Sequence, residues 1–426
     1  RTPWTRNSHC RKAADETVIM NEKPGSVFGG MLLIAGSCIG AGMLALPILT
    51  GLSGFFPSLA MFICAWCFMT ITGFLLVEVN GWFDKRVNII SMAQHSLGDI
   101  GRGLGWILYL FLFYSLLVAY TSLSGHLVSS YFQNAFEMMI PSWIGSFFFV
   151  FLFGWIVYLG TRPVDLWNRC LMVGKVVTYL GLVLLGARYV QVDNLLRKAP
   201  SLAVFSLPVL FIAFGYHNMI PSLTSYMRGD LRRVRLTILG GSLITLTVYL
   251  IWQYLILGIV PLEGSSGILD SLKNDKDASQ ALTGVLGMSW VSSFGSGLAF
   301  FAILTSFLAQ ALALVHFLAD GLKIDHKRRE NIFLCALALL PPLLCSIIYP
   351  QLFFKALNFA GGICTAILFG ILPVCMVWVG RYKKGIVSSY EVFGGKPLLL
   401  AVFLFSLFII FFQLSSMFGA SYIPKP

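Results

Sequence analysis

Two long apolar segments of this 426-residue chain are interrupted near their middle by glycine and proline. The first interruption is Gly36–Gly42, and the second is Phe214–Pro221. A helix that breaks inside a bilayer leaves backbone N–H and C=O groups without partners, which is tolerated only where the backbone lines a cavity or binds a ligand. When such breaks recur at corresponding positions of two halves, they indicate the substrate site of a secondary transporter.

Apolar runs of about 20 residues, the length of a membrane-spanning helix, occur throughout the chain. Charged residues make up only 11% of the sequence, whereas an ordinary soluble domain has roughly 25%. We therefore predict an all-α polytopic membrane protein with about eleven transmembrane helices, of which the first and the sixth are broken. The predicted spans are 26–49, 54–80, 104–131, 143–160, 170–189, 202–222, 235–260, 287–318, 331–349, 352–379 and 397–418.

The net charge of +12 reflects membrane topology rather than nucleic-acid binding. With the N-terminus inside, 22 of the 30 Lys and Arg residues fall in the segments of one side of the membrane, and six fall on the other. Because basic residues accumulate in cytoplasmic loops, the N-terminus is predicted to be cytoplasmic and the C-terminus outside. The lipid bilayer is then the surroundings of the protein, and neither a nucleic acid nor an obligate protein partner is indicated.

The order of the spans indicates an internal repeat. Spans 1 to 5 and 6 to 10 correspond, and the two broken centres lie roughly 180 residues apart. Since five is an odd number, the second unit enters the membrane from the opposite side, which makes the repeat an inverted one. The predicted organisation is a cytoplasmic N-terminal segment (1–24, of which 1–19 precede a candidate start at Met20), a first repeat (25–190), a second repeat (201–379) and a cytoplasmic loop with an appended helix (380–426).

The first break has the backbone chemistry that a zwitterion needs. N–H groups that are freed at the start of a half-helix bind a carboxylate at the positive end of the helix dipole, and freed carbonyls on the other side hold an ammonium group. The alternative is that the glycines only allow neighbouring helices to approach closely. The candidate substrate-binding residues here are Gly36, Ser37, Cys38, Gly40, Ala41 and Gly42.

The second break gathers aromatic and polar side chains. Aromatic rings stack on an apolar or aromatic substrate group, while the imidazole and the carboxamide offer hydrogen bonds that orient it. The alternative for an aromatic residue in such a chain is packing against lipid or a neighbouring helix. With two hydroxyl residues of the third span, the candidate side-chain pocket consists of Phe214, Gly215, Tyr216, His217, Asn218, Tyr120 and Ser124.

Ionisable residues inside apolar runs are functional candidates because they are costly in a bilayer. Lys175 either extends to the membrane interface or faces the first broken helix and the Thr305–Ser306 pair, where a change of protonation could couple a proton to the substrate. Glu78 is either an interfacial pairing residue or part of a proton relay. The candidates for proton coupling are Lys175, Thr305, Ser306 and Glu78.

Other polar features indicate structure rather than chemistry. His126 and His316 are expected to be hydrogen-bonded interior histidines. The longest outside loop, around 261–286, is expected to be a solvated loop, with a gate or lid as the alternative. Its acidic residues are Asp270, Asp275 and Asp277. The CxxC spacing of Cys64 and Cys67 has no second pair, so we expect small apolar residues rather than metal or disulfide chemistry.

Several separated motifs carry a resemblance to a known family. They are Gly40–Pro47 (GAGMLALP), Phe214–Leu223 (FGYHNMIPSL), Thr305–Leu308 (TSFL), Phe317–Asp320 (FLAD), Pro341–Leu344 (PPLL) and Tyr349–Pro350. Over most of the chain from Met20 onward, these motifs resemble the bacterial hydroxy/aromatic amino acid permeases, with the tyrosine- and tryptophan-specific permeases nearest in pattern. The sequence departs from the family at His316, where an acidic residue is common.

The resemblance implies a LeuT-like fold of the amino acid–polyamine–organocation type, with a 5+5 inverted repeat. It implies proton-coupled uptake of an aromatic amino acid across the inner membrane. Lys175, Thr305 and Ser306 would stand where sodium-coupled relatives hold a sodium ion, and distant relatives have a proton-responsive lysine in the fifth span. No metal, cofactor or covalent chemistry is implied, because protons are the coupling ion.

We therefore interpret the chain as a proton symporter for an aromatic amino acid, with tyrosine favoured and tryptophan next, and not as an enzyme. Another neutral amino acid as the substrate, or uncoupled exchange, remains the alternative. A channel would need rings of charge or a carbonyl filter, and an intramembrane enzyme would need paired catalytic groups at depth. No sequence feature separates a transporter from a non-transporting sensor of the same fold.

Overall fold

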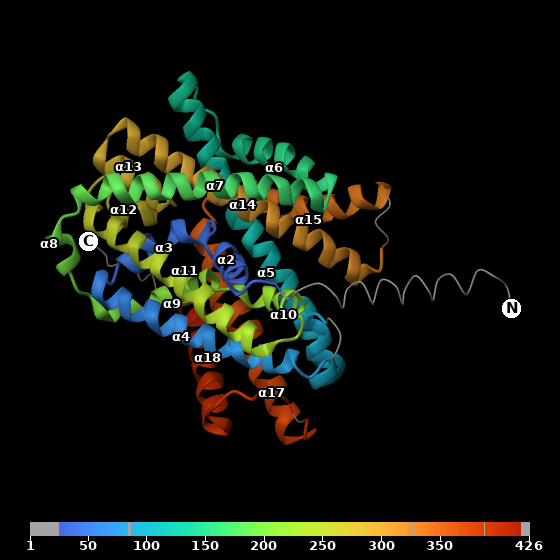
Figure 1. Ribbon diagram of the computed structural model, residues 1–426. Helices are drawn as coiled ribbons and strands as arrows, with labels where there is room; N and C mark the ends of the chain where they lie inside the picture. The colour runs from blue at the N-terminus through green and yellow to red at the C-terminus, as the bar shows by residue number, and fades with distance from the viewer. Residues whose placement is uncertain (1–24, 84–86, 325–327, 387, 419–426) are drawn as a thin grey trace.

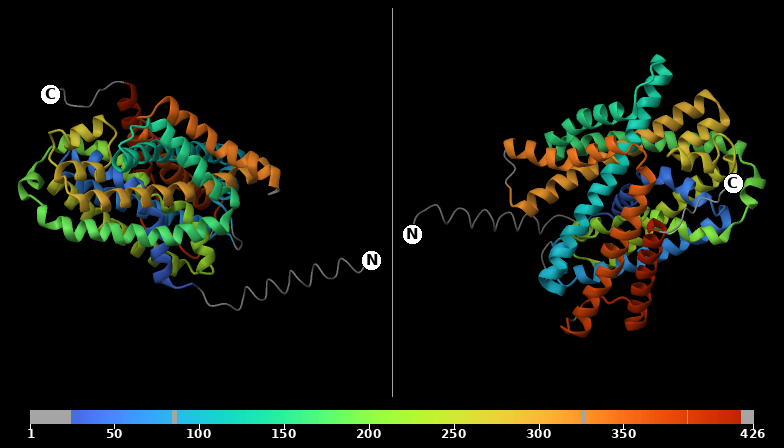
Figure 2. Two further views of the ribbon diagram at one scale, coloured as in Figure 1. Left: turned by 90° about the horizontal axis from the view of Figure 1, so that it is seen from above. Right: turned by 180° about the vertical axis from the view of Figure 1, so that it is seen from behind.

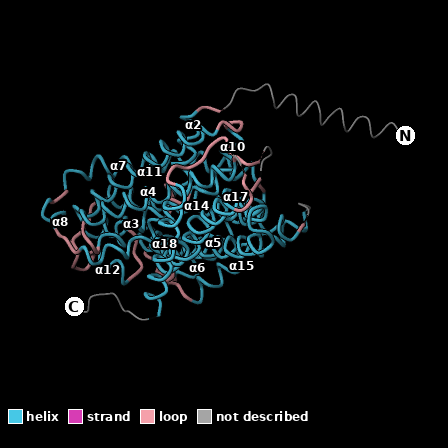
Figure 3. Tube along the Cα trace, turned by 90° about the horizontal axis from the view of Figure 1, so that it is seen from below, coloured by secondary structure: helices cyan, strands magenta, loops and turns pink. Residues whose placement is uncertain are grey.

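Helices form all the regular structure in the part of the chain that the structure describes (Figure 1). This computed structural model describes residues 25–83, 87–324, 328–386 and 388–418, and those ranges contain no strand (Figure 3). The prediction of an all-α protein is therefore confirmed. The predicted N-terminal segment 1–24, with its candidate start at Met20, lies outside the described residues.

The long apolar runs form helices that can cross a membrane. Within the described ranges, ten helices are long and apolar enough, or eleven when one bent pair is counted as a single span. A helix satisfies its own backbone hydrogen bonds, which is why apolar runs of this length adopt it in lipid. The uninterrupted helices are α4 (Phe55–Asn80), α5 (Ile89–Phe136), α6 (Ser142–Leu159), α7 (Thr161–Gly186), α11 (Leu231–Ile259), α14 (Ser289–Leu322), α15 (Arg328–Ile348) and α18 (Gly395–Phe418).

The first span is broken where the glycines predict it. Helix α2 (Val27–Cys38) and helix α3 (Gly42–Gly51) are bent by 62° across Ile39–Ala41. At the break, the Gly40 N–H donates to the Cys38 carbonyl at 2.8 Å, a contact too short-range to continue the helix. The chain therefore turns at the depth of the bundle core, and α3 is almost wholly buried.

The sixth span is unwound rather than sharply bent. Helix α9 (Leu207–Ala213) ends at Phe214, Gly215 is non-helical, and a 3₁₀ turn η3 (Tyr216–Met219) leads into α10 (Ile220–Tyr226). Pro208 and Pro221 stand in the first turns of α9 and α10. A proline lacks only an N–H that would be unpaired there in any case, so both prolines favour the start of a new helix.

The tenth span contains an irregularity that the sequence did not indicate. Between α16 (Phe353–Phe359) and α17 (Leu372–Tyr382), residues Ala360–Ile371 form a π-helix, η4. A side chain at Gly361 would overlap the carbonyl of Pro208 in α9. The wider helix therefore packs directly on the first half of the broken sixth span.

Two predicted boundaries differ from the structure. Helix α5 begins at Ile89 rather than near 104, with the Asn88 side chain capping the Ser91 N–H and Gly98 (φ 74°) kinking the helix. Helix α7 begins at Thr161, so the segment predicted as a loop before residue 170 is helical. Both starts are rich in polar residues, which hid them from a search for apolar runs.

The loop around 261–286, which was predicted to lie outside, is folded. It contains α12 (Ile268–Lys273) and α13 (Ala278–Leu286), whose first turn is capped by the Asp277 carboxylate. Asp275 and Asp277 are buried. The expectation of a solvated loop is therefore wrong for these two carboxylates, because their backbone N–H partners draw them into the protein.

The helices form a bundle with two distinct ends (Figures 1 and 2). Helices α8 (Val192–Leu196), α12 and α13 lie at one end, which we call the α8 end, and α10 and the described start of α2 lie towards the other, the α10 end. Helix α5 crosses the bundle obliquely in the opposite views of Figure 1 and the right panel of Figure 2. The breaks occupy the first and sixth spans, as the repeat prediction requires, while the repeat boundaries stay predictions.

Candidate functional site

The two helix breaks lie against each other in the core. The hydroxyl of Tyr249, on α11, faces the Cys38 carbonyl at 2.7 Å and the Ala213 carbonyl at 3.0 Å. These carbonyls end α2 and α9, which are the first halves of the two broken spans. One tyrosine hydroxyl therefore serves both breaks, and it holds them at the same depth.

Side chains of α14, α7 and α11 form hydrogen bonds with the backbone at and just after the first break. The Ala41 N–H donates to Ser306 Oγ of α14 at 2.9 Å, and Lys175 Nζ of α7 donates to the Ile39 carbonyl at 2.5 Å. Trp252 Nε1 of α11 donates to the Met43 carbonyl at 3.1 Å. A Cβ at Gly40 would meet Ser306 Oγ, so glycine is what permits this approach. The backbone opened by the break is thus solvated by protein groups.

Lys175 is buried, with 3% of its surface exposed, and it does not extend to the membrane interface. Tyr120, also buried, directs its hydroxyl towards Ser306. Lys175 and Ser306 therefore lie at the first break, which is one of the two alternatives given for Lys175, and Tyr120, which was predicted for the side-chain pocket of the second break, lies there with them. The Thr305 hydroxyl instead bonds to the Phe301 carbonyl of its own helix at 2.8 Å.

Three other predicted residues do not face the first break: Ser37 and Gly36, which were predicted to bind substrate there, and Ser124, which was predicted for the side-chain pocket. Ser37 is exposed and bonds to the Ile34 carbonyl of its own helix. Gly36 lies next to Met172 of α7, which fits the close-packing alternative. The Ser124 hydroxyl bonds to the Thr121 carbonyl within α5. Each of these groups is satisfied locally, so none adds a polar atom to the break.

The predicted ring-reading residues of the second break pack mostly into the surrounding helices. Tyr216 and His217 are fully buried and bond to α4, through the Met69 carbonyl at 3.0 Å and Thr72 Oγ1 at 2.9 Å. The imidazole stacks on Phe369 of η4 at 4.5 Å, and His217 Nδ1 has no hydrogen-bond partner among the described residues. Phe214 packs edge-on against Tyr249. Of this group, Asn218 reaches a cavity.

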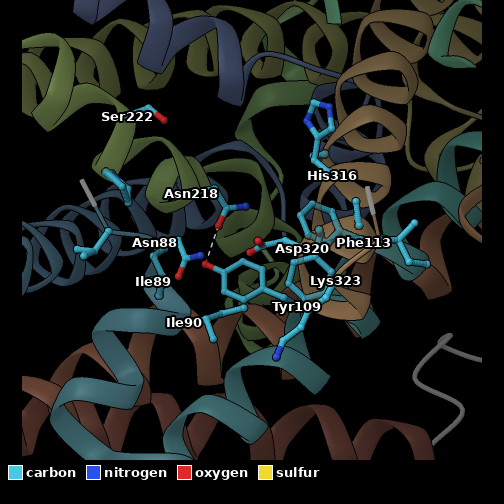
Figure 4. Close-up of a pocket in the computed structure, with 16 residues that line it drawn as sticks. Asn88, Ile89, Ile90, Tyr109, Phe113, Asn218, Ser222, His316, Asp320 and Lys323 are labelled. Carbon is cyan, nitrogen blue, oxygen red and sulfur yellow. Dashed lines mark hydrogen bonds between the residues drawn. The ribbon is translucent and has the colours of Figure 1, made fainter. Parts of the chain in front are cut away.

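A cavity of about 890 Å³ opens beside the second break, between α5, η3, α10 and α14. The size suits a small ligand. Tyr109, Phe113 and Phe317 supply aromatic rings, and Tyr109 donates its hydroxyl to Asn218 Oδ1 at 2.7 Å (Figure 4). The lining residues are Val87, Asn88, Ile89, Ile90, Tyr109, Phe113, Asn218, Pro221, Ser222, Ala313, His316, Phe317, Ala319, Asp320, Lys323 and Ile324.

A smaller hollow of about 330 Å³ lies at the α8 end of the bundle, where Asp193, Arg197 and Glu263 are among the residues that line it. The Arg197 guanidinium donates to the Leu52 carbonyl at 3.0 Å and to the Gly51 carbonyl, so it closes over the last turn of α3. The larger cavity therefore opens at the α10 end.

The folded loop around 261–286 adds to this closure. Asp275 accepts hydrogen bonds from the N–H groups of Phe353 (2.9 Å) and Phe354 (3.3 Å), at the start of the tenth span. Burial raises the pKa of the Asp275 carboxyl, and these two N–H groups oppose that rise. Burial also raises the pKa of Asp277.

Glu78 forms a buried ion pair rather than facing either break. Its carboxylate accepts from Arg381 Nε (2.6 Å) and from a second guanidinium nitrogen (2.5 Å), and it also accepts from the Val392 N–H at 2.8 Å. These contacts join α4 to α17 and to the loop that precedes α18. They favour the pairing role of Glu78 over the proton relay.

The sequence analysis missed Tyr249 and the aromatic wall of the cavity. Tyr109 and Phe113 are four residues apart on α5, and Ala313, Phe317 and Asp320 share one face of α14. Residues at such spacing lie on one helix face, so a search for polar and aromatic residues at that spacing would have found both walls. Tyr249 has a comparable signal, because Thr245, Trp252 and Gln253 lie three or four residues from it on α11 and are buried with it.

The comparisons with known proteins agree with this architecture. A family model described as the tryptophan/tyrosine permease family matches residues 23–413. The "Tyrosine-specific transport system 2" of Haemophilus influenzae is 32% identical, covering 90% of this chain and 94% of that protein. The "Tyrosine-specific transport system 1" of the same organism is 30% identical (89% and 94% covered), and its "Tryptophan-specific transport protein" is 28% identical (94% and 98% covered).

A solved structure is similar along nearly the whole chain. The crystal structure of MhsT in complex with L-phenylalanine matches with a TM-score of 0.59 and 14% identity, covering 93% of this chain and all of that one. At this identity the similarity shows the fold. It confirms the LeuT-like fold that the sequence motifs implied.

Proposed function

The chain belongs to the tryptophan/tyrosine permease family, and we propose that it imports an aromatic amino acid, preferably tyrosine, by proton symport. As a member of this bacterial family with many apolar helices, it is a multi-pass inner membrane protein. The observation that supports the substrate class most strongly is the aromatic-walled cavity that ends at Asn218, beside the paired helix breaks.

The cavity and the first break provide for different parts of the substrate. The aromatic rings offer a surface on which a substrate ring stacks. The first break offers a backbone N–H at Ala41 and a carbonyl at Ile39, which Ser306 and Lys175 now occupy. We propose that the substrate carboxylate and ammonium groups exchange with these side chains. His217 Nδ1, which is buried and has no partner in the described ranges of the chain, is a further group that a bound substrate would satisfy.

The preference for tyrosine is supported by the relatives. The two that are named tyrosine-specific are 32% and 30% identical to this chain, whereas the tryptophan-specific protein of the same organism is 28% identical. The difference in identity is small, so the preference needs a direct measurement of competition between amino acids.

Lys175 is proposed to carry the coupling proton. A buried ammonium is costly unless it is paired, and Lys175 Nζ donates to a neutral carbonyl at the first break. Loss of the proton would weaken the contact with Ile39 and change the same backbone that binds the substrate. Thr305, whose hydroxyl bonds within α14, is proposed to support Ser306 rather than to contact the proton.

The orientation follows from the charge asymmetry. Because 22 basic residues fall on the side of the N-terminus and six on the other, we propose that the α10 end is cytoplasmic. The large cavity then opens to the cytoplasm, and the α8 end is the closed outer side. This is the arrangement from which an importer would release its substrate.

The test is uptake into proteoliposomes that contain the full chain. Labelled tyrosine would be driven by an imposed proton gradient, with and without a protonophore, and challenged with unlabelled amino acids. We expect gradient-driven accumulation that aromatic amino acids inhibit. Uptake that ignores the gradient would exclude symport and favour exchange, and uptake inhibited best by another neutral amino acid would exclude the aromatic substrate.

A further inference from the structure

The cavity wall carries a hydrogen-bonded pair that can distinguish aromatic rings from one another. Tyr109 lies on α5 and is 5% exposed, and Asn218 lies on η3, the turn that follows the second break. Their side chains meet at 2.7 Å, with the tyrosine hydroxyl donating to the carboxamide oxygen (Figure 4). The pair therefore joins an unbroken helix to the unwound part of the sixth span.

The surroundings of this pair are aromatic. The ring of Tyr109 lies 6.1 Å from Phe113, 6.2 Å from Phe317 and 6.4 Å from Phe369, between ring centroids. Phe113 and Phe317 also contact each other at 5.5 Å. A substrate ring that stacks in this wall would meet the hydroxyl and the carboxamide as a polar point within an apolar surface.

The pair still has hydrogen-bonding capacity. A tyrosine hydroxyl has one hydrogen and two acceptor lone pairs, and a carboxamide nitrogen has two hydrogens. The Tyr109 hydroxyl donates its hydrogen to Asn218, so its oxygen can still accept a hydrogen bond. Figure 4 shows the Asn218 amide nitrogen on the side away from Tyr109. The pair can thus present one acceptor and one donor to a ligand.

We propose that Tyr109 and Asn218 are the specificity-determining residues, which read the polar group on the substrate's aromatic ring. This inference rests on the proposed function. A phenol hydroxyl can donate to Tyr109 and accept from Asn218, an indole N–H can only donate, and a phenyl ring can do neither. The expected order of preference is therefore tyrosine, then tryptophan, then phenylalanine, since a site built to bond a hydroxyl discriminates against a ligand that lacks it.

The test is competition uptake with Tyr109→Phe, which removes the hydroxyl and keeps the ring. Labelled tyrosine uptake into proteoliposomes is inhibited by unlabelled tyrosine, tryptophan or phenylalanine, and the half-inhibitory concentrations are compared. We expect the preference for tyrosine over phenylalanine to fall about tenfold, the effect of about one hydrogen bond. Phenylalanine itself should inhibit the variant about as well as it inhibits the unmodified protein.

The matched control is Tyr114→Phe. Tyr114 is on the same helix, but its hydroxyl bonds to the Leu337 carbonyl of α15 at 2.8 Å and it does not line the cavity. This variant loses one half-buried, hydrogen-bonded hydroxyl without touching the proposed pair, so its order of preference should be unchanged. If Tyr109→Phe cannot be purified as a folded protein, Asn218→Ala tests the same pair from the other side and should reduce the same ratio.

The outcomes separate this inference from the proposed function. No aromatic inhibition in the unmodified protein would overturn the proposed function. If Tyr109→Phe and Asn218→Ala both take up tyrosine normally and keep the same preference for tyrosine over phenylalanine, the inference alone is overturned. Equal loss for all three amino acids would also overturn it, because the pair would then only tie α5 to η3.

Discussion

Two buried charged side chains, Lys175 and Glu78, have opposite surroundings. The Glu78 carboxylate meets the Arg381 guanidinium at two points and a backbone N–H at a third. The Lys175 amine meets a neutral backbone carbonyl at the first helix break. A compensated charge stabilises a fixed structure, whereas an uncompensated one in a bilayer is a candidate for proton exchange. Glu78 is therefore expected to stabilise the structure, and Lys175 is the candidate for proton exchange.

Replacing Lys175 by alanine should abolish the pH dependence of accumulation and leave some exchange of substrate. The reason is that the amine, and not the substrate-binding backbone, would be lost. The measurement is gradient-driven tyrosine uptake against tyrosine exchange in the same proteoliposomes. Lys355→Ala is the control, since Lys355 is exposed at the start of the tenth span. Unchanged pH dependence in Lys175→Ala would assign the proton to another group.

Replacing Glu78 by glutamine should lower the thermal stability of the purified protein strongly. The Arg381 side chain, 8% exposed, would keep its charge without a partner, and breaking a buried pair from one side costs about 3 to 5 kcal/mol. Glu78→Gln combined with Arg381→Met should recover part of the loss. Asp165→Asn, in an exposed pair with Arg169, should change the melting temperature little. Equal melting of Glu78→Gln and the unmodified protein would contradict this assignment.

At the scale of elements, the sequence predicted the positions of the helix breaks better than it predicted the conformation of the irregular segments. Glycine and proline marked the breaks of the first and sixth spans, because both residues weaken a helix through the backbone itself. The π-helix of the tenth span also contains glycines, but glycine alone does not distinguish a π-helix from a break, and the two helices of the loop around 261–286 were not predicted. Their form depends on neighbours: Gly361 packs on the Pro208 carbonyl, and Asp275 binds the start of α16.

Burial of Asp275 in the folded loop around 261–286 should make the stability of the protein depend on pH. Burial raises the pKa of Asp275 above its ordinary value of 3.8, so the folded protein binds a proton there more readily than the unfolded chain does. This contribution to stability is present below pH 3.8 and is lost as the pH rises through the raised pKa. The melting temperature of Asp275→Asn, relative to that of the unmodified protein, should therefore rise as the pH increases from about 3.8.

The comparison is made by melting both proteins in detergent across that range. Asp277→Asn should show the same sign, since burial raises the pKa of Asp277 as well. An advantage of Asp275→Asn that shrinks with rising pH would mean that the two backbone N–H groups outweigh burial. In that case the carboxylate would stabilise the docked loop in its charged form.

At the scale of the whole molecule, the two ends of the bundle differ in access. The α10 end contains the large cavity, and the α8 end is closed by Arg197 over α3 and by the docked loop. A transporter that alternates between its two sides would hold the substrate at the paired breaks between these ends. The position of the cavity relative to the membrane sides rests on the proposed orientation.

Cysteine labelling should show that the α10 end faces the cytoplasm. In a background without the native cysteines, Lys323→Cys in the cavity should react with a membrane-impermeant maleimide in inside-out vesicles and stay unlabelled in intact cells. Asp193→Cys at the α8 end should show the reverse. Because the two positions lie at opposite ends of one bundle, labelling of both from the same side would contradict the proposed orientation.

The sequence by itself determined that the chain is a helical membrane bundle with breaks in two particular spans. It did so because a bilayer offers no hydrogen bonds to the backbone. The length of an apolar run therefore predicts a helix, and a glycine or proline interruption predicts a break in it. It also indicated that Lys175 and Ser306 would meet the first break. Only the tertiary structure decided that Tyr249 joins the two breaks and that Asn218 meets Tyr109 at a cavity. Those contacts depend on how each helix is rotated about its axis, and packing against neighbouring helices sets that rotation.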